Sequence, residues 1–363
     1  MDPVWNKPMQ ESDRALDPLG MDRVANRLLD HLLLGITTVT PRARYFSFYV
    51  WAINQIARTS MPKTFREFRS DLYDLERIFM LGCVAHEQDH PQKEGYHTNV
   101  SGSERGRRIW NESKEKVRLD FPFFANKLGG YGQYYRGPIA SLGLTSVLDM
   151  PYEQPTEIGS AVSQAFDRVA TRSGLANLRN KLIVSKGTLK KMGKSSCLCC
   201  LRSSNANDRE VLRELFLGFL ADIDREDSSI RRQQSLYLVM LLSDLAAMRG
   251  FRLSDQDFLN ACYFNQILPA KEVYKVKFPS FLKEIVQTWK LFRSHDYMAF
   301  SAEALLSCFL EFLKQNKSGR RLEEFLNQVT AKQVAKRMRG LTGARIPSRN
   351  LHTELACGKY PLS

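Results

Sequence analysis

The stretch RARYFSFYVWAINQIA, residues 42–57, decides the fold class. It follows Pro41, and proline is favoured at the first turn of helices, where its missing N–H is not needed. The stretch is nearly all apolar beyond its two arginines and dense in aromatic residues, which bury large areas when they pack. The sequence therefore predicts a helix that lies largely in the core.

Apolar residues recur with a helical period along nearly the whole chain, and few segments alternate as strands do. In residues 21–36 the apolar side chains line one face, and Gly35 is a plausible end of that helix. Further helices are predicted over residues 64–85, 157–173, 207–223, 229–250, 281–316 and 319–340. The predicted fold class is mainly α and multi-helical, with two helical lobes.

Residues 129–144, GGYGQYYRGPIASLGL, interrupt this pattern with five glycines and a proline. Such a composition favours loop or short extended structure. We expect this segment to connect the two lobes, with Tyr131, Tyr134 and Tyr135 buried between them rather than stacked on bases. The predicted division is an N-terminal lobe, a connector, a C-terminal lobe and a basic tail, over residues 1–128, 129–156, 157–340 and 341–363.

The chain is strongly basic, with 53 Lys+Arg against 39 Asp+Glu and a net charge of +14 over 363 residues. An excess of this size favours a polyanionic partner, nucleic acid first. The alternatives are an acidic protein partner or a contribution to solubility alone. No secretory signal opens the sequence, no window of about 18 apolar residues predicts a membrane span, and seven cysteines do not suggest a disulfide framework. We expect a cytoplasmic protein with no membrane association.

The longest basic segment runs from Arg168 to Asn207 and contains no acidic residue. Such a segment attracts phosphates and releases their counterions. Because no RNA-binding signature or zinc-finger spacing is present, we expect contacts to the nucleic-acid backbone without sequence specificity. The alternative is a solvated loop without a partner. The predicted contact residues are Arg168, Arg172, Arg179, Lys181, Lys186, Lys190, Lys191, Lys194 and Arg202.

A second basic concentration runs from Lys314 to Arg349, with ten Lys/Arg against Glu323 and Glu324. Within the predicted helix of residues 319–340, basic side chains recur about one turn apart, so that one face can follow a phosphate backbone or an acidic groove. The predicted contact residues here are Lys332, Lys336, Arg337 and Arg339.

The stretch HEQDH, residues 86–90, matches the H-E-x-x-H pattern of zinc metallopeptidases, and His97 follows seven residues later. In those enzymes two histidines one turn apart bind zinc, and the glutamate acts on the metal-bound water. Here Pro91 ends the helix directly after His90, and the turn is otherwise polar. The favoured interpretation is a solvated helix end, with no metal, no cofactor and no catalytic residue; the alternative is a zinc hydrolase using His86, Glu87, His90 and His97.

Three cysteines, Cys197, Cys199 and Cys200, lie together in KSSCLCCLRSS. They lack the C-x-x-C spacing of zinc sites. A metal bound here would need Cys83, Cys262 or a distant histidine as a further ligand, and whether these cysteines bind metal stays open at this point.

The block over residues 33–46 reads L-x-G-I-x-x-x-T-x-R-A-R-Y-F. It resembles the opening of an uncharacterised bacterial family of helical proteins, and residues 129–144 and CLCCLRSS with NDREVLRELFLGF resemble later blocks of that family. The resemblance assigns no catalytic residue. The resemblance implies that the protein is encoded among phage-defence or mobile-element genes. It also implies that the protein acts as a partner of a larger protein, such as an ATPase or a nuclease.

Together these observations predict a non-catalytic basic subunit of a bacterial antiphage-defence or DNA-processing complex, with DNA favoured over RNA. The alternatives are the zinc hydrolase, a nuclease with an unrecognised site, or a scaffold that grips an acidic protein. Arg42 and Arg44 precede the aromatic helix, and we expect them to pair with carboxylates of neighbouring helices rather than with phosphate.

Overall fold

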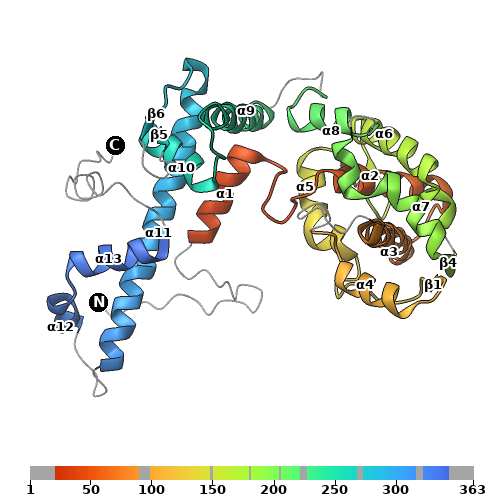
Figure 1. Cartoon of the computed structure of the whole chain (residues 1–363), viewed down its shortest axis with the longest axis horizontal. Helices are drawn as coiled ribbons and strands as arrows, with labels where there is room; N and C mark the ends of the chain where they lie inside the picture. The colour runs from red at the N-terminus through yellow and green to blue at the C-terminus, as the bar shows by residue number, and fades with distance from the viewer. Residues whose placement is uncertain are drawn as a thin grey trace. The chain divides into compact units, whose positions relative to one another are not determined.

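The computed structural model describes residues 21–89, 99–147, 150–179, 181–203, 206–220, 227–267, 273–315 and 322–342. Its elements are helices with three short two-stranded sheets, which confirms the mainly α, multi-helical fold (Figure 1). Contacts divide the chain into two compact units: residues 30–236, called here the core unit, and residues 237–363 with residues 1–29. Among the described helices, none is long and apolar enough to cross a membrane.

The core unit is built on four helices that pack in pairs. Helix α2 (Arg44–Thr59) packs on α6 (Glu157–Ser173), and α3 (Phe65–Asp89) packs on α7 (Lys186–Ser196). Helix α6 also contacts α7, which joins the two pairs. Helix α4 (Ser103–Glu112) lies on α3, and α8 (Arg209–Phe216) contacts α2 and α6.

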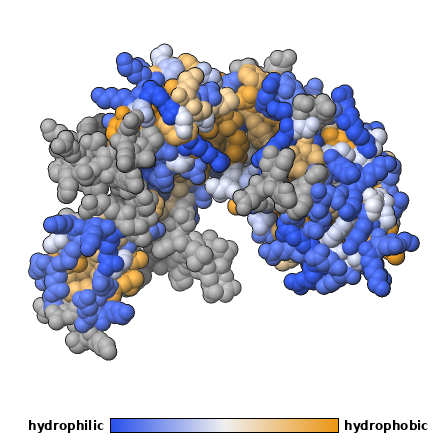
Figure 2. All heavy atoms as spheres, in the orientation of Figure 1, coloured by the Kyte–Doolittle hydropathy of each residue, from blue (hydrophilic) through white to orange (hydrophobic). Residues whose placement is uncertain are grey.

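Helix α2 lies at the centre of the core unit, and most of its residues are buried, as its composition predicted. Tyr45 and Tyr49 stack with their ring centroids 5.2 Å apart, and Phe48 stacks on Phe79 of α3 at 4.0 Å. Stacked and edge-on ring contacts of this kind add to the free energy gained from burying the rings. Figure 2 shows that the outer face of this unit, on the right of the view, is mainly hydrophilic.

Residues 129–144 were expected to form a loop or extended connector, and this prediction is wrong. They form a π-helical turn, Tyr131–Tyr135, followed by α5 (Arg136–Ser141). Glycine tolerates helical dihedrals, and the proline lies in the first turn of α5, where no intrahelical N–H is required. Tyr131 and Tyr135 are buried, but inside the core unit rather than between two lobes, and Tyr134 is half-buried. The segment therefore lies inside one compact unit, and the contact-based boundaries fall near residues 29 and 236 instead.

Short strands close the loops between the helices. Strand β1 (Lys116–Arg118) pairs antiparallel with β4 (Ile183–Ser185), with Lys116 opposite Ser185. Strand β2 (Thr145–Ser146) pairs with β3 (Gln154–Pro155) in the same way. Two 3-10 helices follow α6 and α7, at Leu175–Leu178 and Leu198–Arg202.

In the second unit, α11 (Lys283–Gln315) is the long helix expected over residues 281–316, and it packs against α10 (Asp255–Phe264) and α13 (Ala331–Thr342). The helix expected over residues 319–340 is two helices, α12 (Leu322–Gln328) and α13. The remaining elements are a short 3-10 helix, Ser280–Leu282, and the antiparallel pair β5 (Gln266–Ile267) and β6 (Tyr274–Lys275). The two boundaries between the units, after residues 29 and 236, fall within helices α1 (Met21–Leu33) and α9 (Asp227–Met248).

Two glycines let α3 and α7 approach each other closely. A Cβ atom on Gly82 of α3 would lie 2.0 Å from Met192 Cε, and one on Gly193 of α7 would lie 2.2 Å from the Gly82 carbonyl oxygen. A Cβ on Gly193 would also lie 2.9 Å from His86 Cβ. The absence of a side chain at both positions therefore brings the end of α7 onto the last turns of α3.

Candidate functional site

His86 does not lie in a solvated helix end, and that prediction is wrong for this residue. Its side chain is buried near the end of α3, beneath the C-terminal end of α7. Glu87, the next residue, accepts hydrogen bonds from the guanidinium of Arg107 on α4, with Nε to Oε2 at 2.8 Å and Nη2 to Oε1 at 3.1 Å. Successive helical residues point about 100° apart. His86 and Glu87 accordingly face different neighbours, α7 and α4.

The other two histidines of the metallopeptidase alternative, His90 and His97, lie outside the described residues. Within the described part, the glutamate of the pattern is held by Arg107 rather than directed towards the imidazole. The arrangement of His86 and Glu87 therefore lends no support to a zinc hydrolase that uses Glu87 as its general base.

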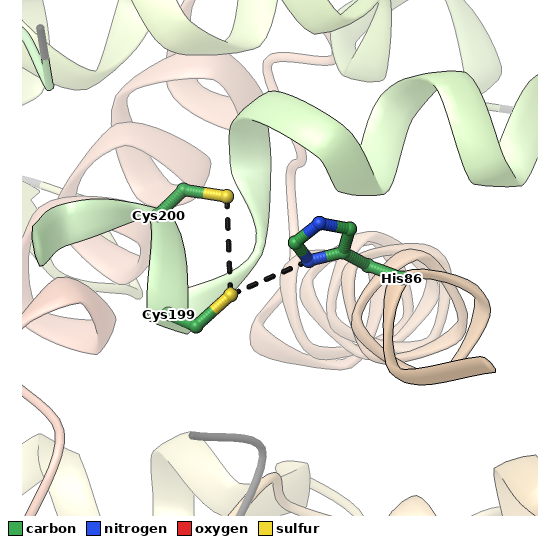
Figure 3. Close-up of side chains that lie close together, drawn as sticks. All are labelled: His86, Cys199 and Cys200. Atoms are coloured by element: carbon green, nitrogen blue, oxygen red, sulfur yellow. Dashed lines mark hydrogen bonds between the residues drawn. The ribbon is translucent and has the colours of Figure 1, made fainter. Parts of the chain in front are cut away.

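His86 instead meets two cysteines from a segment distant in the sequence. The Sγ atom of Cys199 lies 3.3 Å from Nδ1 of His86 and 4.0 Å from the Sγ atom of Cys200 (Figure 3). One ligand atom from each of the three residues falls within 4.8 Å of the others. We call these three residues the thiol–imidazole cluster. The cysteines come from the 3-10 helix that directly follows α7.

The thiols of this cluster hold their protons strongly. Hydrogen bonding with Cys197, followed by burial, raises the pKa of Cys199 to about 12. The pKa of Cys200 is also raised, first by its hydrogen bond with Cys199 and then by burial. The Cys200 thiol lies 3.3 Å from the carbonyl oxygen of Lys194, to which it donates. In the ligand-free protein the cluster is therefore uncharged at its sulfurs at neutral pH.

Arg44 fixes the segment that carries these cysteines. Its guanidinium binds the carboxylate of Asp208 through Nε at 2.9 Å and Nη2 at 2.7 Å. Its Nη1 donates to the carbonyl oxygens of Ser195 at 3.1 Å and Cys197 at 2.7 Å, at the end of α7. Arg44 and Asp208 are both buried. The expected pairing of Arg44 with a carboxylate of a neighbouring helix is confirmed.

The basic segment of residues 168–207 is folded into α6, α7 and the turns around them rather than forming a solvated loop. Arg168 and Arg172 lie one turn apart on α6, and Lys191 and Lys194 lie about one turn apart on α7. All four side chains are exposed, and none forms an ion pair with another residue that the structure describes. Because α6 packs on α7, we treat these four residues as one basic face.

Arg172 and Lys194 are brought together directly. Both line a pocket of about 140 Å³, together with Ser203, Asn207 and Cys200. Arg44 also borders this pocket, but its charge is already balanced by Asp208. The pocket thus carries two uncompensated positive charges from two helices, beside polar side chains that can donate hydrogen bonds.

Other predicted contact residues in this segment interact within the protein. Arg179 binds Asp71 at 2.7 Å, and Lys190 binds Asp89 at 2.6 Å. The ammonium of Lys186 lies 4.8 Å from the ring centroid of Trp110. Lys181 and Arg202 are exposed. The acidic and aromatic partners come from α3 and α4, so the sequence of the basic segment gave no indication of them.

Of the four residues predicted to form the second basic surface, Arg337 interacts within the protein. Lys332 and Lys336 are exposed on α13. Arg337 donates to Ser307 Oγ at 2.8 Å and pairs with Glu311, both on α11, so it holds the two helices together. The side chain of Arg339 lies outside the part of the structure that can be described.

No protein-family model, no curated protein and no solved structure matches this chain. The resemblance of residues 33–46 to a bacterial family is therefore still an expectation.

Proposed function

We propose that this chain binds the sugar–phosphate backbone of nucleic acid, without reading base sequence, through the basic face of α6 and α7. The observation that carries the proposal is the shared pocket of Arg172 and Lys194, which joins exposed charges of two helices at one place. Arg168 and Lys191 extend the same positive surface by one helical turn on either helix.

The charges of the basic face suit a phosphate backbone for a physical reason. Arginine and lysine that neutralise phosphates release condensed counterions, and this release supplies most of the free energy of sequence-independent binding. Side chains already paired with acidic residues, such as Arg179 and Lys190, contribute little to such binding. The proposal therefore assigns the contact to the exposed residues and not to the whole segment.

The setting of this activity is a further part of the proposal. We infer a non-catalytic subunit of a larger bacterial assembly for antiphage defence or DNA processing, with DNA as the favoured ligand and a larger ATPase or nuclease as a partner. This part rests on the resemblance of the opening block and of the two later blocks to the bacterial family. The net charge of +14 supports a polyanionic partner but does not distinguish nucleic acid from an acidic protein.

Fluorescence anisotropy with labelled duplexes of unrelated sequences tests the proposal. Replacement of Arg172, Lys191 and Lys194 by alanine should weaken binding by about ten-fold or more, equally for every duplex. The matched control replaces three exposed residues elsewhere in the core unit, Lys63, Arg66 and Lys127, by alanine. This variant loses the same amount of positive charge. Equal weakening by both triple variants would show a general effect of net charge, and the proposed face would then be wrong.

Binding of an acidic protein instead of nucleic acid is the competing outcome. If no duplex or single strand binds at low salt while an acidic chain copurifies and is lost in the first triple variant, the basic face serves a protein scaffold. Comparison of DNA and RNA duplexes in the same assay decides between the two nucleic acids.

A further inference from the structure

We infer that the thiol–imidazole cluster is a zinc-binding site, in which Cys199, Cys200 and His86 supply three ligands to one Zn²⁺ ion. The inference is independent of nucleic-acid binding. It rests on the positions of three ligand atoms that belong to two segments of the chain and on the chemistry of those atoms.

The distances agree with tetrahedral zinc coordination. With Zn–S near 2.3 Å and Zn–N near 2.0–2.1 Å, a tetrahedral ion places two sulfurs about 3.8 Å apart and a sulfur and a nitrogen about 3.5 Å apart. The two Sγ atoms are 4.0 Å apart, and Cys199 Sγ is 3.3 Å from His86 Nδ1. The ligand atoms of Cys200 and His86 complete the triangle within 4.8 Å. The adjacent cysteines thus converge here without a C-x-x-C spacing.

The donor set selects a thiophilic metal. Two thiolates and one imidazole suit Zn²⁺, whereas Ca²⁺ and Mg²⁺ require oxygen ligands. Binding replaces the two thiol protons: two S–H groups and Zn²⁺ give two Zn–S bonds and two released protons. The charges of the ion and of the two thiolates cancel, so no net charge is left in a partly buried site. Cys200 gives up its hydrogen bond to the Lys194 carbonyl when it loses its proton.

The surroundings fit a bound ion in two further respects. The pocket beside Cys200 places one of the three ligands next to space that water can enter. Arg44, held by Asp208, fixes the carbonyl groups of Ser195 and Cys197 and so orients the turn that carries the ligands. An ion bound here would join the end of α3 to the end of α7, beside the close contact of Gly82 and Gly193.

The site is tested on the full chain, stripped with a chelator in the presence of a reductant. Zinc is titrated in competition with a chromophoric chelator, and Co²⁺ is added separately to detect thiolate-to-cobalt charge-transfer absorption. We expect one ion per chain and a rise in the thermal unfolding temperature on zinc addition. Loss of a residue that only hydrogen-bonds a metal ligand weakens metal binding by roughly 10- to 100-fold. We expect a larger loss of zinc affinity when a ligand itself is replaced, in Cys199→Ser, Cys200→Ser or His86→Asn.

Two control variants separate this site from its alternatives. Cys262→Ser removes a buried cysteine from the second unit and should leave affinity and cobalt absorption unchanged. His90→Ala removes a ligand of the metallopeptidase pattern and should also have no effect. Circular dichroism shows whether each variant folds, and the cobalt spectrum of a folded variant reports ligation directly. Zinc binding of unchanged affinity in folded Cys199→Ser, loss of binding in His90→Ala, or no stoichiometric binding by the unmodified chain would each overturn the inference.

Discussion

Arg44 and Asp208 form a bidentate ion pair inside the core unit, although 164 residues separate them in the sequence. Arg44 opens the aromatic helix α2, and Asp208 directly precedes α8. Ser47 donates to the same carboxylate at 2.9 Å. The pair therefore links α2 to the start of α8, and Arg44 also fixes the turn that carries Cys199 and Cys200.

Removal of one partner of this pair should be strongly destabilising. Asp208→Asn leaves the guanidinium of Arg44 buried without its counter-charge, and loss of one partner of a buried pair costs about 3–5 kcal/mol. Denaturant unfolding followed by circular dichroism measures the change. The control is Glu210→Gln, which breaks an exposed pair with Arg213 and should cost no more than about 0.5 kcal/mol. If the two substitutions cost the same, the buried pair does not have the role assigned to it.

Glu76 should make the protein less stable as the pH rises. Its side chain is fully buried, accepts from Tyr49 and from the Gly130 amide, and has a pKa raised by burial to about 7. Because the folded pKa lies above the unfolded one, this contribution to stability is complete below about pH 4.5 and is lost as the pH rises to about 7. The loss is about 3 kcal/mol, from a shift of about 2.5 pH units.

Glu76→Gln should remove this dependence because an amide cannot ionise. The measurement is the free energy of unfolding in urea at pH 5 and pH 8 for the unmodified chain and the variant. Glu112→Gln, at an exposed position, is the control and should preserve the original slope. A slope unchanged by Glu76→Gln would show that Glu76 ionises normally in the folded protein.

Gly193→Ala should separate α3 from α7. The added Cβ would lie 2.2 Å from the Gly82 carbonyl oxygen, so the helices must move apart, and overpacking of this kind costs about 1–3 kcal/mol. Gly187→Ala on the same helix is the matched control, because the added Cβ would meet only Ser185 Oγ, at 3.9 Å. Alanine has a better helix propensity than glycine, so this substitution should stabilise the protein by up to about 1 kcal/mol. Thermal unfolding measures both. Stabilisation by both substitutions would contradict the close approach of the two helices.

The helical architecture could be predicted because apolar residues recur with a helical period along most of the chain, as in α11, and because the α2 stretch is nearly all apolar. The helical structure of residues 129–144 could not be predicted, because the glycines of this segment suggested a loop. Its buried tyrosines hold it in helical turns. His86 and Cys199 are 113 residues apart, and only the packing of α3 on α7 brings them together. The sequence indicated only that a metal at these cysteines would need Cys83, Cys262 or a distant histidine as a further ligand.

Prediction of the basic contact residues from the sequence was limited in the same way. The sequence identified the charged segment, but it could not show which of its members have partners, because Asp71 and Asp89 belong to a distant helix. The structure shows that three of the nine candidates interact within the protein and that six are exposed, four of them on α6 and α7.

The dependence of DNA affinity on salt concentration tests the central claim most directly. Each phosphate contact contributes about 0.9 to the slope of log K against log salt concentration. The unmodified chain should therefore show a steep negative slope, and the variant lacking Arg172, Lys191 and Lys194 should show a slope smaller by about 2–3. An unchanged slope in that variant, or DNA binding that does not depend on salt, would contradict the account.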